Sequence, residues 1–212
     1  MIFNDHSKLE GMHAFLGASK FNWINWSDEI LEKRYYGRYA QQLGTAIHEL
    51  AKDLILSRTR LSKSDKKLIT LFLHREGIPR GAYDAELILT NLIPFVNDAI
   101  GYHMSPEVIL FHSMNCFGTT DAISFSEKQK ILRIHDLKTG VVKGHIEQLL
   151  VYAALFCLEY RKKPKDFTTE LRIYQNLEVL IHIPEPEEIE KFMYFITSRN
   201  ELVKNLIERD YR

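Results

Sequence analysis

Two short alternating segments separated by a charged turn constrain the fold more than any other part of the sequence. Residues 119–125 and 131–138 each alternate apolar and polar side chains, and the residues between them are polar. The stretch 118–140 therefore predicts an antiparallel hairpin. If the turn is centred between Lys128 and Gln129, residues that pair across the hairpin have numbers that sum to 257.

This register places two acidic side chains opposite each other. Asp121 pairs with Asp136, and Lys138 lies on the same face two residues further along. The rest of that face is apolar and consists of Ile123, Phe125, Leu132 and Ile134. The opposite face is expected to be the more solvated one and consists of Ala122, Ser124, Arg133 and His135.

Two carboxylates at the end of an apolar face are unfavourable on their own, because like charges repel across a sheet and burial disfavours ionisation. A hard divalent cation binds carboxylate oxygens and would offset both effects. We therefore predict a metal site at Asp121 and Asp136; the alternative is that both acids lie at a solvated rim. Glu107 precedes this hairpin and could face the pair, but a glutamate at a strand end is expected to be exposed.

Composition limits the class of protein. The 212 residues are 45% hydrophobic, which is enough for one globular core. Lys+Arg and Asp+Glu are both 28, so the chain is not a strongly basic nucleic-acid binder, and polyanion contact would depend on local patches or a metal. Cys116 and Cys157 are expected to be small buried side chains, too few for a disulfide framework. The sequence has no secretory signal and no apolar run of about 20 residues, which predicts a soluble cytoplasmic protein without membrane contact.

The remaining pattern predicts an α/β (α+β) fold. A buried helix over 145–160 lies between the strand 131–138 and a strand over 169–174, so these two strands are expected to be parallel. A further strand is predicted over 178–183 and a single first strand over 108–117. Helices are predicted over 28–57, 61–75, 82–100 (with a kink at Pro94) and from Glu187 onward.

Two N-terminal features carry further expectations. In the helix over 28–57, His48 borders the apolar stripe, and Gly44 one turn earlier would let another backbone come close. In the aromatic segment before it, Ser19 is expected to cap a helix. Trp23 and Trp26 are expected to pack that segment onto the body, and base stacking is the alternative.

Four fragments occur in order along the chain: Gly44-x-x-x-His48, Gly118-x-x-Asp121, Asp136-x-Lys138 followed by Thr139-Gly140, and Gln148-x-x-x-Tyr152. With the acids on a hairpin and the last pair on the following helix, the chain resembles the PD-(D/E)xK nuclease superfamily. Within it, the chain is similar to the branch of the RecB nuclease domain, the CRISPR-adaptation exonucleases and the lambda-type exonucleases. The resemblance covers residues 15–183 and is weakest over 61–101.

The resemblance implies a restriction-endonuclease-like core, a central mixed sheet of about five strands flanked by helices. Residues 1–212 would form a single nuclease domain in four parts. These are an N-terminal segment and helix carrying His48, a helical insertion, a catalytic core and a C-terminal helix, over 1–60, 61–105, 106–183 and 184–212.

The resemblance also implies the roles of the site residues. The ligands of a Mg²⁺ or Mn²⁺ ion would be His48, Asp121, Asp136 and the backbone carbonyl of Leu137. Lys138 would orient or help deprotonate the attacking water, and Gln148 and Tyr152 would support this lysine or touch the DNA strand. Asp136 stands where many relatives have Glu, which shortens the reach to the metal. The cysteines that hold an iron–sulfur cluster in several relatives are missing, so no cluster is expected.

The implied activity is hydrolysis of DNA phosphodiester bonds by an exonuclease that acts on ends or single strands in recombination, repair or DNA degradation. The chain is similar in length to small stand-alone phage members, which act in the host cytoplasm with recombination or replication proteins. Lambda-type relatives form rings and others are monomers, so the oligomeric state stays open. The alternative is a catalytically silent nuclease-fold module that binds DNA or protein.

Overall fold

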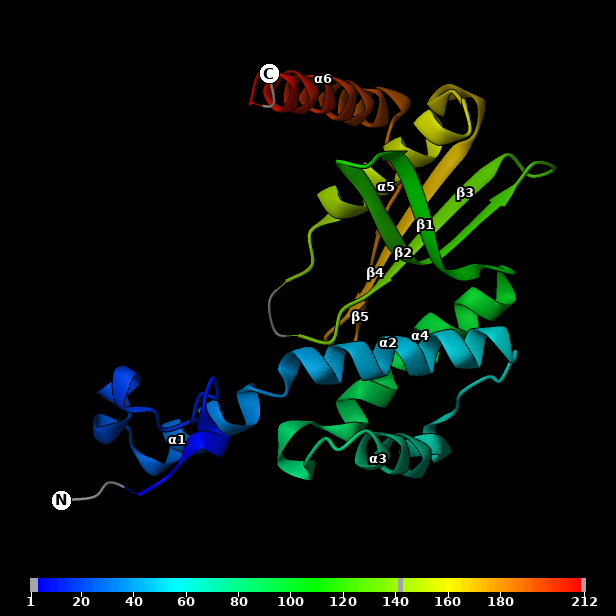
Figure 1. The fold of residues 1–212 in the computed structure, drawn as a ribbon. Coiled ribbons are helices and arrows are strands. Elements are labelled where there is room, and N and C mark those ends of the chain that lie inside the picture. Colours follow the sequence, from blue (N-terminus) through cyan, green and yellow to red (C-terminus); the bar gives the residue numbers. More distant parts are fainter. Residues whose placement is uncertain (1–3, 141–142, 211–212) are drawn as a thin grey trace.

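A five-stranded mixed sheet forms the centre of the molecule (Figure 1), in a computed structural model that describes residues 4–140 and 143–210. The strands lie in chain order: β1 (Ser105–Ser113), β2 (Cys116–Ser126), β3 (Ile131–Leu137), β4 (Thr168–Gln175) and β5 (Glu178–His182). Neighbouring strands are antiparallel except β3 and β4, which are parallel and are joined through a helix. The predicted α/β class, the five strands and the strand–helix–strand unit are confirmed.

The hairpin of β2 and β3 has the predicted register. Ala122 pairs with His135, and Ile123 pairs with Ile134, so partner numbers sum to 257. The paired residues end at Ala122, one step before Asp121. The amide of Leu137 donates to Oδ2 of Asp121 over 2.7 Å, which holds the two strands together beyond their last pair.

The single strand predicted over 108–117 is wrong, because the chain reverses in the middle of it. β1 ends at Ser113, and β2 begins at Cys116 and pairs back along β1. The amide of Asn115 donates to Oγ of Ser113 over 3.1 Å, so a serine and an asparagine close a turn that no glycine or proline marks.

The helices are α1 (Asp28–Gly37), α2 (Ala40–Leu56), α3 (Lys66–Arg75), α4 (Ala85–Gly101), α5 (Ile146–Glu159) and α6 (Pro186–Asp210). Helices α2 to α4 lie on one face of the sheet, and α5 and α6 lie on the other. The helix predicted over 28–57 is two helices, α1 and α2. Pro94 lies inside α4 as predicted. Ser19 is not a cap, because it lies inside a 3₁₀ segment; Ser27 caps α1 by accepting a hydrogen bond from the amide of Ile30. No helix in the described ranges is long and apolar enough to cross a membrane.

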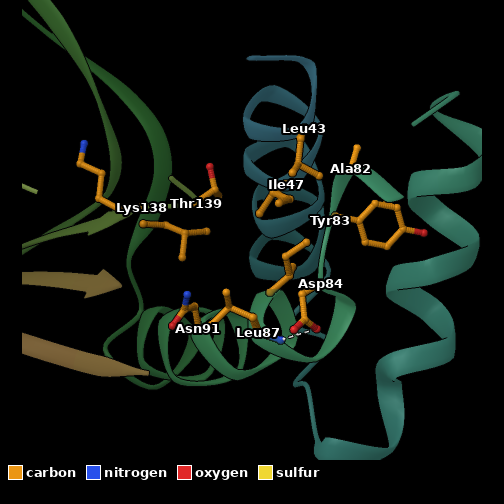
Figure 2. A pocket seen from close by; sticks show the side chains of 11 residues that line it. Leu43, Ile47, Ala82, Tyr83, Asp84, Leu87, Asn91, Lys138 and Thr139 are labelled. Atoms are coloured by element: carbon orange, nitrogen blue, oxygen red, sulfur yellow. Dashed lines mark hydrogen bonds between the residues drawn. The ribbon is translucent and has the colours of Figure 1, made fainter. Parts of the chain in front are cut away.

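A cavity of about 140 Å³ lies between α2, α4 and the end of β3 (Figure 2). Its walls include Leu43 and Ile47 of α2 and Leu87 of α4, and Lys138 and Thr139 form its edge. The Lys138 ammonium points out of this cavity toward the carboxylate of Asp136. The cavity is therefore mainly an apolar space beneath the loop that follows β3.

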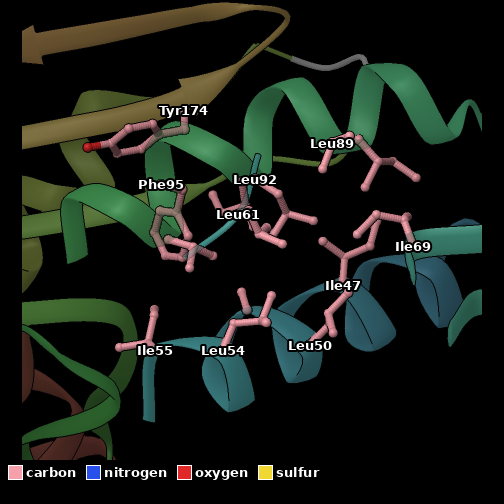
Figure 3. Packing of buried hydrophobic residues seen from close by; sticks show 14 of the residues in the cluster. Ile47, Leu50, Leu54, Ile55, Leu61, Ile69, Leu89, Leu92, Phe95 and Tyr174 are labelled. Atoms are coloured by element: carbon pink, nitrogen blue, oxygen red, sulfur yellow. The ribbon is translucent and has the colours of Figure 1, made fainter. Parts of the chain in front are cut away.

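Two apolar cores lie on the two faces of the sheet. On one face, α2, α3 and α4 pack together around Leu92 and Phe95, and Tyr174 of β4 joins them (Figure 3). On the other face, α5 and α6 pack over Ile134 and Leu171. Residues 61–101 form part of the core because α3 and α4 bury their apolar stripes against α2 and the sheet. Cys157 is buried in the second core, Cys116 is half-buried, and both are free thiols.

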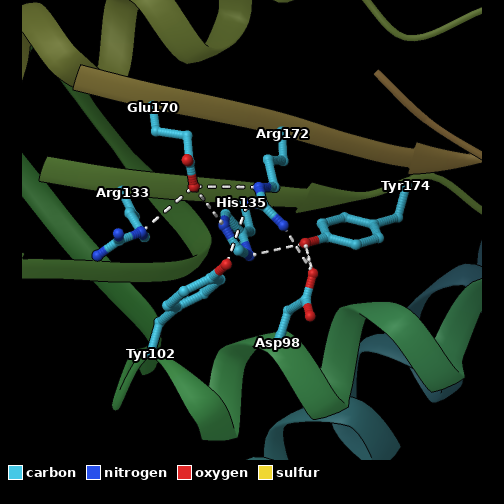
Figure 4. A network of polar contacts seen from close by, with 7 residues as sticks. All are labelled: Asp98, Tyr102, Arg133, His135, Glu170, Arg172 and Tyr174. Carbon is cyan, nitrogen blue, oxygen red and sulfur yellow. Dashed lines mark hydrogen bonds and ion pairs between the residues drawn. The ribbon is translucent and has the colours of Figure 1, made fainter. Parts of the chain in front are cut away.

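The sheet face that was expected to be more solvated is instead covered by α4, so that prediction is wrong. Ala122 and His135 have no exposed surface, and Ser124 and Arg133 are half-buried. The polar side chains of this face form a network that links β3 and β4 to α4 and its C-terminal turn (Figure 4), although Nε2 of His135 makes no hydrogen bond within the described residues. Its members are Asp98, Tyr102, Arg133, His135, Glu170, Arg172 and Tyr174.

The network fixes His135 in its neutral form. The Tyr174 hydroxyl is 3.1 Å from Nδ1 of His135 and donates to Asp98 over 2.8 Å, while Arg172 donates to the same carboxylate oxygen over 2.8 Å. Burial lowers the pKa of His135 to about 3, and the positive charges of Arg172 and Arg133 act in the same direction. The histidine therefore connects the sheet to α4 as an uncharged group.

Candidate metal centre

Three side chains from different elements converge at one end of the sheet. His48 of α2, Glu107 of β1 and Asp121 of β2 each offer a ligand atom, and these atoms lie within 4.8 Å of one another. Nδ1 of His48 is 3.2 Å from Oδ1 of Asp121. An imidazole nitrogen and two carboxylate oxygens at this spacing can hold a divalent metal ion.

Helix α2 brings His48 to the sheet in the predicted way. Ile47 and Leu50 are buried against the core, which leaves the His48 side chain 30% exposed at the border of the apolar stripe. A Cβ added at Gly44 would lie 3.5 Å from Oγ1 of Thr139. The small residue thus lies where α2 passes close to the loop after β3.

Glu107 belongs to this site, and the expectation of an exposed side chain is wrong. Its neighbours Pro106 and Val108 pair with Ala122 and Thr120, which sets Glu107 opposite Asp121. The side chain is half-buried and the backbone has φ 53°, a left-handed conformation that non-glycine residues rarely adopt. Such strain, of order 1–3 kcal/mol, is often found at functional sites.

Asp136 lies at the end of β3 beside this group, with 3% of its surface exposed. Nζ of Lys138 is 3.1 Å from each carboxylate oxygen of Asp136. Oδ2 makes no hydrogen bond within the described part of the chain. Burial and the charge of Asp121 together raise the pKa of Asp136 to about 6, against the opposing charge of Lys138. The positive charge of Lys138 therefore does not fully offset the burial of this carboxylate and its repulsion by Asp121.

Lys138 is held by the helix that follows it. Its ammonium donates to Oε1 of Gln148 over 2.9 Å, and Nε2 of Gln148 donates to the hydroxyl of Tyr152 over 3.3 Å. Gln148 lies in the first turn of α5, and its side chain is exposed. The lysine backbone is fixed as well, since its amide donates to the carbonyl of Tyr174 over 3.0 Å.

The acidic surroundings affect the other titratable groups. Burial disfavours the charged imidazole of His48, but the hydrogen bond to Asp121 and the charges of Asp121, Glu107 and Asp136 outweigh it, so its pKa is raised. Burial also raises the pKa of Glu107, and the charge of Asp121 adds to the rise. A cation among these carboxylates would relieve both effects.

The structure gathers the predicted residues at one end of the sheet, in two connected sets. His48 and Asp121 lie together with the additional Glu107, and Asp136 lies with Lys138, which contacts Gln148. The amide of Leu137 contacts Asp121, and the role of its carbonyl oxygen as a ligand stays a prediction. An open groove of about 460 Å³ gives access to the first set. No family model, curated protein or solved structure matches this chain.

Proposed function

We propose that the protein is a Mg²⁺- or Mn²⁺-dependent deoxyribonuclease with a restriction-endonuclease-like core of the PD-(D/E)xK type. It would act as an exonuclease on DNA ends or single strands, in recombination, repair or DNA degradation. One observation supports this most. The group of one histidine and two acids at the end of the sheet lies beside a lysine that Asp136 and Gln148 hold in place. The choice of DNA as the substrate and the preference for DNA ends are taken from the resemblance to the superfamily.

The residues present fit a divalent ion. His48, Glu107 and Asp121 would hold it, and Asp136 offers a buried oxygen without a hydrogen bond beside them. All four donors are carboxylate oxygens or imidazole nitrogen, which suits Mg²⁺ through the acids and Mn²⁺ through both. When bound, such an ion polarises a phosphoryl oxygen and lowers the pKa of a coordinated water.

Lys138 supplies the fixed positive charge of the site. Its ammonium lies between the carboxylate of Asp136 and the amide oxygen of Gln148, so it is oriented before substrate arrives. A scissile phosphate beside Asp136 would meet this charge, which favours the more negative transition state over the ground state. The same ammonium can orient the attacking water. The hydroxyl of Tyr152 fixes the Gln148 amide and so completes the support.

The test is metal-dependent cleavage of end-labelled DNA. We expect the protein to degrade linear single- or double-stranded DNA with Mg²⁺ or Mn²⁺, to spare circular DNA, and to stop when the metal is chelated. Lys138→Ala should be inactive with an unchanged circular dichroism spectrum, while Arg199→Ala on α6 should retain activity. Equal activity in the Lys138→Ala protein would contradict the proposal. Absence of Mn²⁺ binding in a calorimetric titration would favour the silent binding module.

Gly118→Ala is expected to lower the cleavage rate by roughly tenfold to a hundredfold, because sub-ångström to ångström misplacement of catalytic groups has effects of this size. A Cβ at Gly118 would lie 2.9 Å from Cε1 of Tyr152, so the ring must move away from Gln148. Gly101→Ala is the matched control, since the nearest atom to its Cβ is 3.8 Å away on Arg60. Equal rates in both variants would show that the Tyr152 position does not matter.

A further inference from the structure

Arginines and aromatic rings form an exposed cluster where α1 meets α2. The guanidinium carbon of Arg38 lies 4.2 Å from the ring centre of Tyr35, 4.9 Å from that of Tyr39 and 5.7 Å from that of Phe15. One turn earlier, the guanidinium of Arg34 lies 5.1 Å over Trp26. We call this the arginine–aromatic cluster, and its members are Phe15, Trp26, Arg34, Tyr35, Arg38 and Tyr39.

The positive charges of the cluster are not neutralised by acids. Within the described residues, neither Arg34 nor Arg38 forms an ion pair, and Arg38 instead donates to the Tyr39 hydroxyl over 2.8 Å. By contrast, Arg133 and Arg172 on the sheet are paired with Glu170. An exposed guanidinium that stacks on rings keeps its N–H edge free for phosphate, and exposed rings offer faces to bases.

A path of two adjoining grooves, which share two lining residues, leads from Arg38 to the metal centre. Arg38 lines its first part, which has a volume of about 410 Å³, and Thr45 and Glu49 line both this part and the groove at the metal centre. Arg38 lies in the turn just before α2, and Thr45 and His48 follow it along α2. Figure 1 shows the N-terminal segment and α1 beyond the start of α2, clear of the sheet.

The length of this path sets the size of its ligand. His48 lies eight residues into α2 from Ala40, and Arg38 and Tyr39 precede the helix in a turn with helical φ/ψ. At about 1.5 Å per residue, the ten residues from Arg38 to His48 span roughly 15 Å. A stacked strand advances by about 3.4 Å per nucleotide, so the path accommodates about four nucleotides. Glu49 and Glu76 line the groove between its ends, which favours phosphate contact at Arg38 and at the metal centre over contact along the middle.

We propose that the arginine–aromatic cluster binds single-stranded DNA about four nucleotides from the bond that is cleaved. Arg38 contacts a phosphate, and the rings beside it, Tyr35 in particular, stack on a base. This inference rests on the proposed function and extends it. It places the bound DNA strand along α2, between the cluster and the metal centre, and it requires the DNA to be single-stranded at the cluster. Exposed Phe21 and Ile24 near the cluster make a protein partner the competing outcome.

The experiment measures binding of labelled oligothymidylates of 2, 4, 8 and 12 nucleotides by fluorescence anisotropy, with Ca²⁺ and in the Lys138→Ala background to prevent cleavage. Arg38→Ala should weaken binding of the 8-mer and 12-mer roughly tenfold and leave the 2-mer unchanged. Arg38→Lys should restore part of the loss, since it keeps the charge but not the planar stacking group. Tyr35→Ala should weaken the long oligonucleotides as well.

Arg199→Ala is the matched control, because Arg199 is exposed on α6 and should not affect binding of any length. Losses that are equal for 2-mer and 12-mer, or no loss at all, would overturn the inference. So would failure of the Lys138→Ala protein to bind any of the oligonucleotides, which would point to a protein partner. Length-dependent binding that requires Arg38, in a protein whose intact form cleaves no DNA, would refute the proposed function and uphold only the cluster as a binding site for single-stranded DNA.

Discussion

Asp136→Asn is expected to abolish DNA cleavage and at the same time to stabilise the metal-free protein. The pKa of Asp136 rises from its ordinary value of 3.8 to about 6, chiefly through burial and the charge of Asp121. At about 1.4 kcal/mol per pKa unit, its ionised carboxylate destabilises the fold by about 3 kcal/mol at pH 8. Asparagine has a similar shape and carries no charge, so it removes this repulsion together with the metal-binding oxygen.

The sign of the pH dependence separates this effect from a general change in packing. Because the pKa of the folded state is raised, the destabilisation is complete above about pH 6 and fades as the pH falls toward 3.8. Chemical denaturation should therefore show the variant as the more stable protein at pH 8 and not at pH 4. Mn²⁺ should raise the melting temperature of the wild type only. Asp166→Asn, an exposed substitution, is the control. A variant that is less stable at pH 8 would contradict the prediction.

His135→Gln is expected to make the protein less sensitive to acid. The pKa of the buried His135 is about 3 in the folded state and 6.5 ordinarily. Between these pH values the unfolded chain binds a proton at this residue and the folded protein does not. This lowers stability as the pH falls from 6.5 toward 3, by on the order of 3 kcal/mol between pH 7 and pH 4. Glutamine does not titrate, and its side-chain amide can donate a hydrogen bond to the Tyr174 hydroxyl, which itself donates to Asp98.

The measurement is the free energy of unfolding of both proteins in urea at intervals from pH 7 to pH 4. The difference between wild type and variant should change by about 3 kcal/mol over this range, with the variant gaining relative to the wild type in acid. Asp136 has the opposite pH dependence, but it is present in both proteins and cancels in the difference. A difference that stays constant with pH would show that His135 is protonated in the folded state.

The hairpin and the buried helix could be predicted because their signals are local. Alternation over 119–125 and 131–138 defines two faces, and a turn of fixed length then determines every cross-strand pair, so Ile123 and Ile134 meet as predicted. Helix α5 is apolar enough to require burial against the sheet. A buried helix that connects two strands predicts that they are parallel, as β3 and β4 are. The same logic placed Asp121, Asp136 and Lys138 at one end of the sheet.

The features that were missed depend on contacts between distant segments. The apolar run over 108–117 has no glycine or proline, so its reversal at Asn115 left no mark in the periodicity. Glu107 lies opposite Asp121 through the pairing of β1 with β2, and its backbone adopts a left-handed conformation that the sequence does not indicate. His135 and Arg172 are polar residues of a kind usually found on the solvated face of a strand. The partner of Arg172 is Asp98 of α4, which lies 74 residues earlier, so the sequence around Arg172 does not indicate it.

The parallel pairing of β3 with β4 also sets the order in which the site forms during protein synthesis. The hairpin that carries both acids is complete at Leu137, whereas the amide of Lys138 finds its partner only in Tyr174. At about 5–20 residues per second, a ribosome adds the intervening 36 residues in roughly two to seven seconds. A nascent chain therefore displays the acid pair seconds before the backbone of its lysine is fixed, which happens only after synthesis has passed Tyr174, well into the last third of the protein.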